Sequence, residues 1–162
     1  MITIAIFVHA LKQLQNEKGV MNQMKNYLFL TLFLLLFSIN TANATDEAPI
    51  DIKGAETIGT ERAGALLDEG LSFIDVRSTK DFNAGHLPGA HHLAIHSEDF
   101  TAENLSVIVA RDDVVVFYCN GITCMGSSVA SQKAVEWGWT NVIYYREGFR
   151  HWQAEGRLIE QK

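Results

Sequence analysis

The stretch Val-Val-Val-Phe-Tyr-Cys-Asn-Gly-Ile-Thr-Cys-Met-Gly-Ser-Ser, residues 114–128, begins as an unbroken run of apolar, β-branched and aromatic residues. This composition predicts a buried strand that ends at Cys119. A short loop with two glycines follows, after which Ser127 or Ser128 is placed to cap a helix that runs to about Trp137. The stretch therefore predicts a strand, a loop and a helix in succession.

Cys119 lies where the expected strand gives way to the loop. A strand–loop–helix unit directs backbone N–H groups, and the positive end of the helix dipole, toward the start of the helix. A thiol held at such a point ionises more readily than a free thiol, and the thiolate is the reactive form. We interpret Cys119 as a nucleophile in an anion-binding loop. The alternative is an unreactive thiol buried at the end of a strand.

Strand and helix patterns alternate along the rest of the chain. Strands are expected at 56–58, 71–76, 91–95 and 142–145, and helices at 60–69, from Ser97 or Thr101 to Ala110, and at 148–155, with a helical turn at 77–84 that Gly85 closes. This alternation predicts an α/β fold with a central parallel sheet flanked by helices. Ligands of such sheets bind at the carboxyl ends of the strands, where Cys119 lies.

The overall composition excludes several classes of protein. The 162 residues carry a formal net charge of −6 and contain no basic run, so the sequence predicts no positively charged surface that could bind nucleic acid. Two cysteines are too few for a scaffold built on disulfides. Histidines crowd residues 86–96, but His91 and His92 would point to opposite faces of a strand. We therefore expect no metal site.

The N-terminal part of the chain has the pattern of a signal peptide. Residues 27–37 are apolar, too short to span a bilayer comfortably and of the right length for a signal-peptide core. Lys25 supplies the positive flank, and Ala42-Asn43-Ala44 has the form of a cleavage site, so we expect cleavage after Ala44. The destination would be an oxidising compartment, the periplasm, without a stable membrane anchor. The alternative is a retained N-terminal anchor.

The same reasoning divides the chain into segments. Residues 1–44 are expected to be the signal peptide. Residues 1–23 fit no part of one, which suggests that the sequence before Met24 is an over-long start and that translation begins at Met24. Residues 45–54 are polar and are expected to form a flexible lead-in. The folded domain is expected at 55–158, followed by a short tail at 159–162.

Three separated motifs together resemble the signatures of rhodanese-like domains. The first comprises Asp75-Val76-Arg77, then Asp81-Phe82, then Gly-His-Leu-Pro-Gly-Ala at 85–90. Val-Phe-Tyr-Cys at 116–119 resembles the active-site segment, and Gly148-Phe149-x-x-Trp152 resembles the C-terminal signature. The resemblance covers about residues 55–158 and implies a single rhodanese-like domain.

The resemblance also implies an activity. Cys119 would be the catalytic residue of a secreted, single-domain sulfurtransferase, carrying sulfane sulfur as a persulfide from a small donor to a thiol or cyanide acceptor. No metal or organic cofactor would be required. Backbone N–H groups of the active-site loop would stabilise the charged sulfur, and the loop comprises Asn120, Gly121, Ile122, Thr123, Cys124, Met125 and Gly126. The family positions matched by Asp75, Arg77, Asp81 and His86 imply structural roles.

The loop departs from the family pattern in its charge. Typical family loops place an arginine five positions after the cysteine, where this chain has Cys124. Related phosphatases place it six positions on, where this chain has Met125, and the first basic residue after Cys119 is Lys133. The planar guanidinium of arginine binds an oxyanion through two parallel hydrogen bonds. Its absence predicts weak use of thiosulfate and disfavours a phosphatase or an arsenate reductase.

Cys124 leaves three hypotheses open. As a resolving thiol it could form a disulfide with Cys119, which requires Cα atoms about 4.4–6.8 Å apart. The protein could then work as a thiol–disulfide redox protein instead of a sulfurtransferase. Cys124 could also be a small packed residue without chemistry. A third hypothesis is a catalytically silent rhodanese-like module that binds a partner or a small anion.

Overall fold

The structure is a computed structural model that describes residues 21, 23, 25 and 47–162. In it, the strands form one parallel sheet in the order β1-β5-β4-β2-β3. Their bounds are β1 Ala55–Ile58, β2 Ser72–Asp75, β3 His91–His92, β4 Val114–Tyr118 and β5 Asn141–Tyr145. The expected α/β fold with a central parallel sheet is thereby confirmed.

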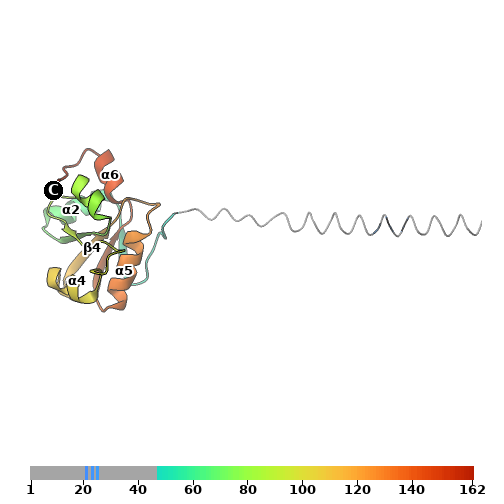
Figure 1. The fold of residues 1–162 in the computed structure, drawn as a ribbon, viewed down its shortest axis with the longest axis horizontal. Helices are drawn as coiled ribbons and strands as arrows, with labels where there is room; N and C mark the ends of the chain where they lie inside the picture. Colours follow the sequence, from blue (N-terminus) through green and yellow to red (C-terminus); the bar gives the residue numbers. More distant parts are fainter. Residues whose placement is uncertain (1–20, 22, 24, 26–46) are drawn as a thin grey trace, which may run out of the picture. The chain divides into compact units, whose positions relative to one another are not determined.

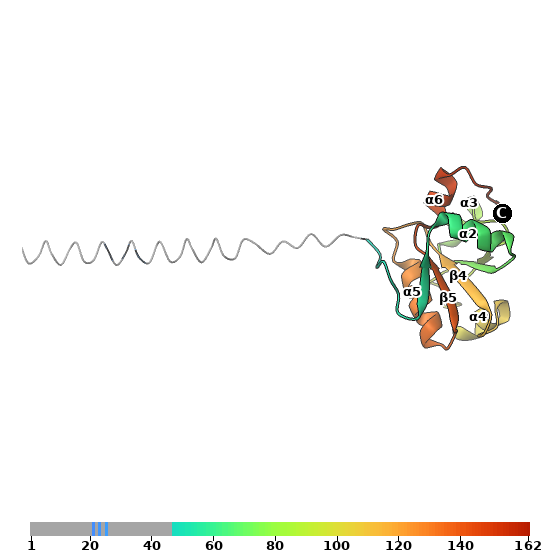
Figure 2. The same cartoon turned by 180° about the vertical axis from the view of Figure 1, so that it is seen from behind.

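Helices cover both faces of the sheet (Figures 1 and 2). Their bounds are α2 Thr60–Asp68, α3 Thr79–Ala84, α4 Ala102–Ile108, α5 Gly126–Glu136 and α6 Gly148–Ala154. Side chains of α4 and α5 pack into the core on one face, and side chains of α2 and α6 pack into the core on the other. The sheet is therefore buried between two layers of helices, as parallel sheets require.

Strand β4 lies in the middle of the sheet and supplies side chains to both cores. Val115 and Phe117 join the core under α4 and α5, whereas Val116 and Tyr118 join the core under α2 and α6. This alternation follows from the two-residue period of a strand. Cys119 comes directly after β4 and falls on the α4–α5 face at the carboxyl edge of the sheet.

The expected serine cap of α5 is wrong. The helix begins at Gly126, with Met125 in the cap position and no capping side chain. Ser128 instead donates a hydrogen bond from its hydroxyl to the carbonyl of Met125, at 2.8 Å, and Ser127 is buried. A side chain at Gly126 would crowd the sulfur of Cys119, so a residue without Cβ begins the helix there.

The two ends of the domain are more tightly held than the sequence indicates. Ala48, in the expected flexible lead-in, is buried and donates its N–H to the carbonyl of Ile122 at 2.7 Å. In the expected tail, Glu160 and His86 exchange two backbone hydrogen bonds of 2.9 Å each. Both segments are therefore packed parts of the domain, through contacts with residues far away in the chain.

The predicted signal peptide, its cleavage site and the start at Met24 lie outside the residues that are described, apart from isolated positions. Among the described residues, no helix is both long and apolar enough to cross a bilayer.

Candidate active site

Cys119 lies at the junction of β4 and α5, and it is only 4% exposed. The first helical hydrogen bond here is donated by Val129 to the carbonyl of Met125, at 3.0 Å. The N–H groups of the preceding first turn, at Gly126, Ser127 and Ser128, therefore have no acceptor within the helix. The positive end of the α5 dipole lies beside the sulfur, because Gly126 approaches Cys119 Sγ so closely.

Cys119 is joined to Cys124 by a disulfide bond, with their Cα atoms 6.3 Å apart. The loop curls back because the N–H of Cys124 donates to the carbonyl of Gly121 at 2.8 Å, which forms a turn. Of the sequence hypotheses for Cys124, the structure contains the one in which the two cysteines pair. In this oxidised state Cys119 has no free thiolate, and reduction by two electrons releases both thiols.

The loop is held from behind by the start of α6. The N–H of Phe149 donates to the carbonyl of Cys119 at 2.9 Å, and that of Arg150 donates to the carbonyl of Asn120 at 3.1 Å. Gly148 has a φ of 63°, and a Cβ atom there would overlap the carbonyl oxygen of Cys119. The C-terminal glycine motif thus allows two backbone segments to approach closely.

A cavity of about 440 Å³ opens over the two cysteines. Apolar side chains form much of its wall, namely Val76, Ile95, Met125 and Val129. Polar residues complete it, namely Arg77, Ser78, Asp81, His96, Asn120 and Thr123. Of the apolar residues, Met125 is 52% exposed and Val129 37% exposed, so part of the mouth of the cavity is apolar.

Arg77 lines this cavity, but its guanidinium is already engaged. It contacts the Asp75 carboxylate through Nη2 at 2.5 Å and Nε at 3.0 Å, and donates to the carbonyl of Gly85 at 2.6 Å. Both members of the ion pair are buried, and Arg77 also stacks on the ring of Phe149 at 4.0 Å. Lys133, the first basic residue after Cys119 in the chain, is also engaged elsewhere: its amino group lies over the rings of Phe100 and Trp137, at 5.7 and 5.9 Å from their centres.

The charge of the site follows from these contacts. Among the described residues, no other lysine or arginine lines the cavity. A bound oxyanion would therefore depend on backbone N–H groups and the helix dipole, without a bidentate guanidinium.

Asp81 and His86 lie at the two ends of α3. Ser78 caps the helix by accepting a hydrogen bond from the N–H of Asp81 at 3.2 Å, and its hydroxyl donates to the Asp81 carboxylate at 2.7 Å. His86 Nδ1 is 2.9 Å from the carbonyl of Phe82, and the imidazole ring stacks on the ring of Phe82. The described residues contain no group of three or more histidine, cysteine, aspartate or glutamate side chains arranged to hold a metal.

Glu147 lies beside the active-site loop, next to Gly121, and the sequence did not identify it as a functional residue. Its carboxylate accepts hydrogen bonds from the N–H of Thr60 at 2.6 Å and from the Thr60 hydroxyl at 2.8 Å. It thereby caps the start of α2 from a residue that is distant in the chain. No local signal reveals this pair, because 87 positions separate the two residues.

The environment of Glu147 shifts its pKa. Burial acts to raise the pKa of the carboxyl group, but the two hydrogen bonds from Thr60 and the nearby His151 and Arg146 act to lower it. The net effect is a pKa below the ordinary value of 4.5, so the charged form is favoured in the folded protein.

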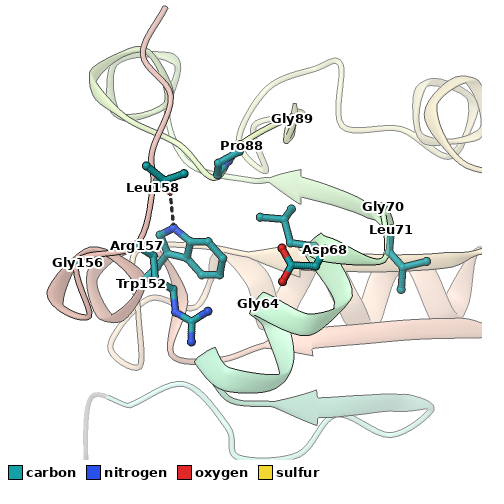
Figure 3. A pocket seen from close by; sticks show the side chains of 11 residues that line it. Gly64, Asp68, Gly70, Leu71, Pro88, Gly89, Trp152, Gly156, Arg157 and Leu158 are labelled. Atoms are coloured by element: carbon teal, nitrogen blue, oxygen red, sulfur yellow. Dashed lines mark hydrogen bonds between the residues drawn. The ribbon is translucent and has the colours of Figure 1, made fainter.

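A larger cavity of about 640 Å³, drawn in Figure 3, is lined by neither cysteine. Residues around it include Gly70 and Leu71, which precede β2, so it opens near the amino edge of the sheet. Figure 3 shows Trp152 beside it, with the indole N–H donating to the carbonyl of Leu158 at 2.8 Å. Cys119 lies at the opposite edge, so this cavity does not contribute to the cysteine site.

Comparisons with known sequences agree with this geometry. The family described as "Rhodanese-like domain" matches residues 60–155. The thiosulfate sulfurtransferase GlpE of Pseudomonas entomophila is 33% identical over 97 residues, covering 60% of this chain and 84% of that protein. The dual specificity phosphatase Cdc25 of Arabidopsis thaliana is 31% identical and the rice arsenate reductase 2.1 is 29% identical, each over 96 residues and 55% of this chain. The chain spans 66% and 60% of these two relatives, less than two thirds of their length.

Solved structures give the same result. The BH2092 protein of Bacillus halodurans has a TM-score of 0.59 at 20% identity, covering 67% of this chain and 79% of that one, and indicates the fold alone. The human single-domain sulfurtransferase TSTD1 has a TM-score of 0.50 at 25% identity, covering 62% of this chain and 97% of that one. The family match, the GlpE relative and the shared fold together show that the chain belongs to the rhodanese-like domain family.

Proposed function

We propose that this protein is a sulfurtransferase whose reduced Cys119 accepts a sulfane sulfur as a persulfide and passes it to a thiol or cyanide. The observation that carries the proposal is the position of Cys119, between the carboxyl end of β4 and the first turn of α5, in the floor of a cavity. The sulfurtransferases among its relatives support the same chemistry.

The reaction would proceed in two displacement steps. The Cys119 thiolate attacks the sulfane sulfur of the donor, a sulfur–sulfur bond forms, and the donor's leaving group departs with the electron pair of the broken bond. The acceptor then attacks the outer sulfur and releases the Cys119 thiolate. Uncommitted N–H groups of the first turn of α5 would stabilise the negative sulfur in both steps.

The cavity indicates which donors suit the site. Its wall is largely apolar, and Arg77, the one arginine that lines it among the described residues, is held by Asp75 and the carbonyl of Gly85. We infer that a donor with an apolar body, such as an aryl thiosulfonate, is used better than thiosulfate, which carries two negative charges on a small ion. The same lack of a free arginine disfavours phosphate ester hydrolysis and arsenate reduction.

The proposed location is the periplasm. The signal-peptide pattern at 27–44 suggests export, and a disulfide between Cys119 and Cys124 can persist in an oxidising compartment. In that location an external thiol reductant would be needed to activate Cys119.

The test is a sulfur-transfer assay on protein that has been reduced and then freed of reductant. With benzenethiosulfonate as donor and cyanide in large excess, so that transfer to cyanide competes with any reaction inside the protein, we expect benzenesulfinate and thiocyanate in equal amounts. Cys119→Ser should abolish both products, whereas Cys124→Ser should retain at least part of the activity. Thiocyanate formation that persists in Cys119→Ser would refute the assignment of the nucleophile.

A second candidate function rests on the disulfide itself. If the protein is a thiol–disulfide redox protein, the Cys119–Cys124 pair should exchange electrons with dithiols, and no sulfur should be transferred from a thiosulfonate. Reduction and reoxidation without benzenesulfinate release would favour this function. If the Cys119→Ser variant left the cellular phenotype unchanged, the third hypothesis, a silent binding module, would stand.

A further inference from the structure

We propose that Cys124 resolves the persulfide on Cys119, so that the sulfur leaves as hydrosulfide and the Cys119–Cys124 disulfide is the product of each turnover. The inference rests on the proposed function, since it requires sulfur to reach Cys119 first. It assigns to the protein a further activity, the reduction of sulfane sulfur to sulfide at the expense of its own two thiols.

The step balances without any further reactant. The Cys124 thiolate attacks Cys119 Sγ, the Sγ–Sγ bond forms, and the bond between Cys119 Sγ and the outer sulfur breaks. The electron pair of that bond leaves with the outer sulfur, which takes a proton and departs as hydrosulfide. Two cysteine thiols lose two electrons in total, and the sulfane sulfur gains them.

The loop geometry favours this step over transfer to an outside acceptor. The two Cα atoms are 6.3 Å apart, and the fold already holds the sulfurs in bonding contact. The turn hydrogen bond from Cys124 to Gly121 holds the loop in its curled form. An outside acceptor must enter the cavity and lose translational and rotational entropy, whereas Cys124 is already beside Cys119.

The two cysteines also differ in exposure, which determines how the cycle closes. Cys119 is buried, whereas Cys124 is partly exposed in the loop. An external dithiol would therefore attack the Cys124 sulfur, and Cys119 would leave as a thiolate beside the first turn of α5. A second exchange within that mixed disulfide frees Cys124, oxidises the external dithiol and restores both thiols.

The test is a single turnover without cyanide. Reduced, desalted protein is mixed with one equivalent of benzenethiosulfonate, and benzenesulfinate, sulfide and intact mass are measured. The wild-type protein should release one equivalent each of sulfinate and sulfide and finish two hydrogens lighter than its reduced form. Cys124→Ser should release sulfinate alone and finish one sulfur atom heavier.

A matched control variant keeps two thiols in the protein but places the second one outside the active-site loop. Val107 on α4 is 85% exposed, so Cys124→Ser combined with Val107→Cys restores a second thiol outside the loop. This variant should keep the sulfur and release no sulfide at low protein concentration, whereas the wild-type rate should be independent of protein concentration.

The outcomes separate the inference from the proposed function. Wild-type protein that releases sulfinate and keeps one extra sulfur, with no sulfide, would overturn the resolving role of Cys124 and leave the sulfurtransferase intact. Equally fast sulfide release from the moved-thiol variant would also overturn it. A lack of sulfinate from every protein would refute the proposed function, and the inference with it.

Discussion

Cys119 has little free space around its sulfur and its carbonyl. A Cβ atom at Gly126 would lie 3.1 Å from Cys119 Sγ, and a Cβ atom at Gly148 would overlap the Cys119 carbonyl. These two glycines begin α5 and α6, so the first turns of two helices fix the position of one cysteine. The chemistry proposed for the site therefore depends on small residues as much as on the cysteine.

The missing loop arginine gives a prediction for Met125, whose side chain lines the cavity mouth. Met125→Arg should raise kcat/KM for thiosulfate by up to about tenfold, because a charge-assisted hydrogen bond to the donor contributes about 1.5–3 kcal/mol before solvent screening. Steady-state thiocyanate assays measure the effect, with both proteins carrying Cys124→Ser so that no internal thiol competes with cyanide. Arginine at Gly126 is unsuitable, because its Cβ would press on the sulfur of Cys119.

Met125→Gln is the control, because glutamine has a similar length and no charge. It should leave thiosulfate use at the wild-type level. An equal gain in both variants, or no gain in Met125→Arg, would show that the missing positive charge does not limit thiosulfate use.

At the level of residues, the sequence shows where the active-site cysteine lies but not that it is paired in a disulfide. Cys119 can be placed because it ends an apolar strand and precedes two glycines. The pairing of Cys124 with it depends on a loop turn and on support from the start of α6, which local patterns do not encode. Glu147 was missed for the same reason, since its partner Thr60 is distant in the chain.

At the level of elements, Glu147 connects α2 to the segment that holds the active-site loop. Its carboxylate caps α2, its backbone carbonyl lies next to Gly121, and α6 begins directly after it. Loss of this carboxylate therefore weakens the start of α2, whereas the backbone contact with the loop remains.

The lowered pKa of Glu147 predicts a pH-dependent stability. Because its folded-state pKa lies below the ordinary 4.5, its carboxylate stabilises the fold above that pH, and the contribution is lost as the pH falls through the folded-state pKa. Glu147→Gln should cost about 0.5–1 kcal/mol near neutral pH, since the group is partly exposed to solvent. The difference from wild type should shrink in acid, measured by urea unfolding at several pH values.

The control is Glu98→Gln, an exposed loop residue without a side-chain hydrogen bond in the described structure. Its difference from wild type should be small and should not follow the same pH course. A Glu147→Gln difference that stays constant from neutral to acid pH would contradict the capping role of the carboxylate.

Element types were predictable, but several boundaries were not. Strand β4 matches its apolar run at 114–118, because burial on both faces leaves a continuous signal. Strand β3 is restricted to His91–His92, where 91–95 was expected, although Leu93 and Ile95 still donate to Asp75 and Val76 at the end of β2. The start of α5 was misplaced because close packing against a sulfur, rather than a serine cap, determines it.

At the scale of the whole domain, the segment before β1 and the active-site loop pack together. Arg146 donates to the carbonyl of Ala48 at 2.9 Å and pairs with Glu47 at 3.0 Å, while Ala48 binds the loop at Ile122. The segment before β1 is thereby connected to the active-site loop. Such contacts join residues about one hundred positions apart, so composition alone describes this segment as a flexible lead-in.

The disulfide gives a prediction for the stability of the whole domain. It closes a loop with a sequence separation of 5, and cross-linking so short a loop restricts the unfolded chain by about 2 kcal/mol. Reduction with dithiothreitol should lower the free energy of unfolding by about that amount, measured by urea denaturation. Cys124→Ser should show no response to the reductant, and equal stability of oxidised and reduced wild type would contradict the prediction.

The central claim is that Cys119 is the atom that receives sulfur, and peptide mass spectrometry tests it most directly. Cys124→Ser protein is reduced, desalted, treated with one equivalent of benzenethiosulfonate, alkylated and digested. The account predicts one extra sulfur atom on the peptide that contains Cys119, between the cysteine and the alkyl group. A peptide alkylated directly on Cys119, with the donor left unconsumed, would contradict it.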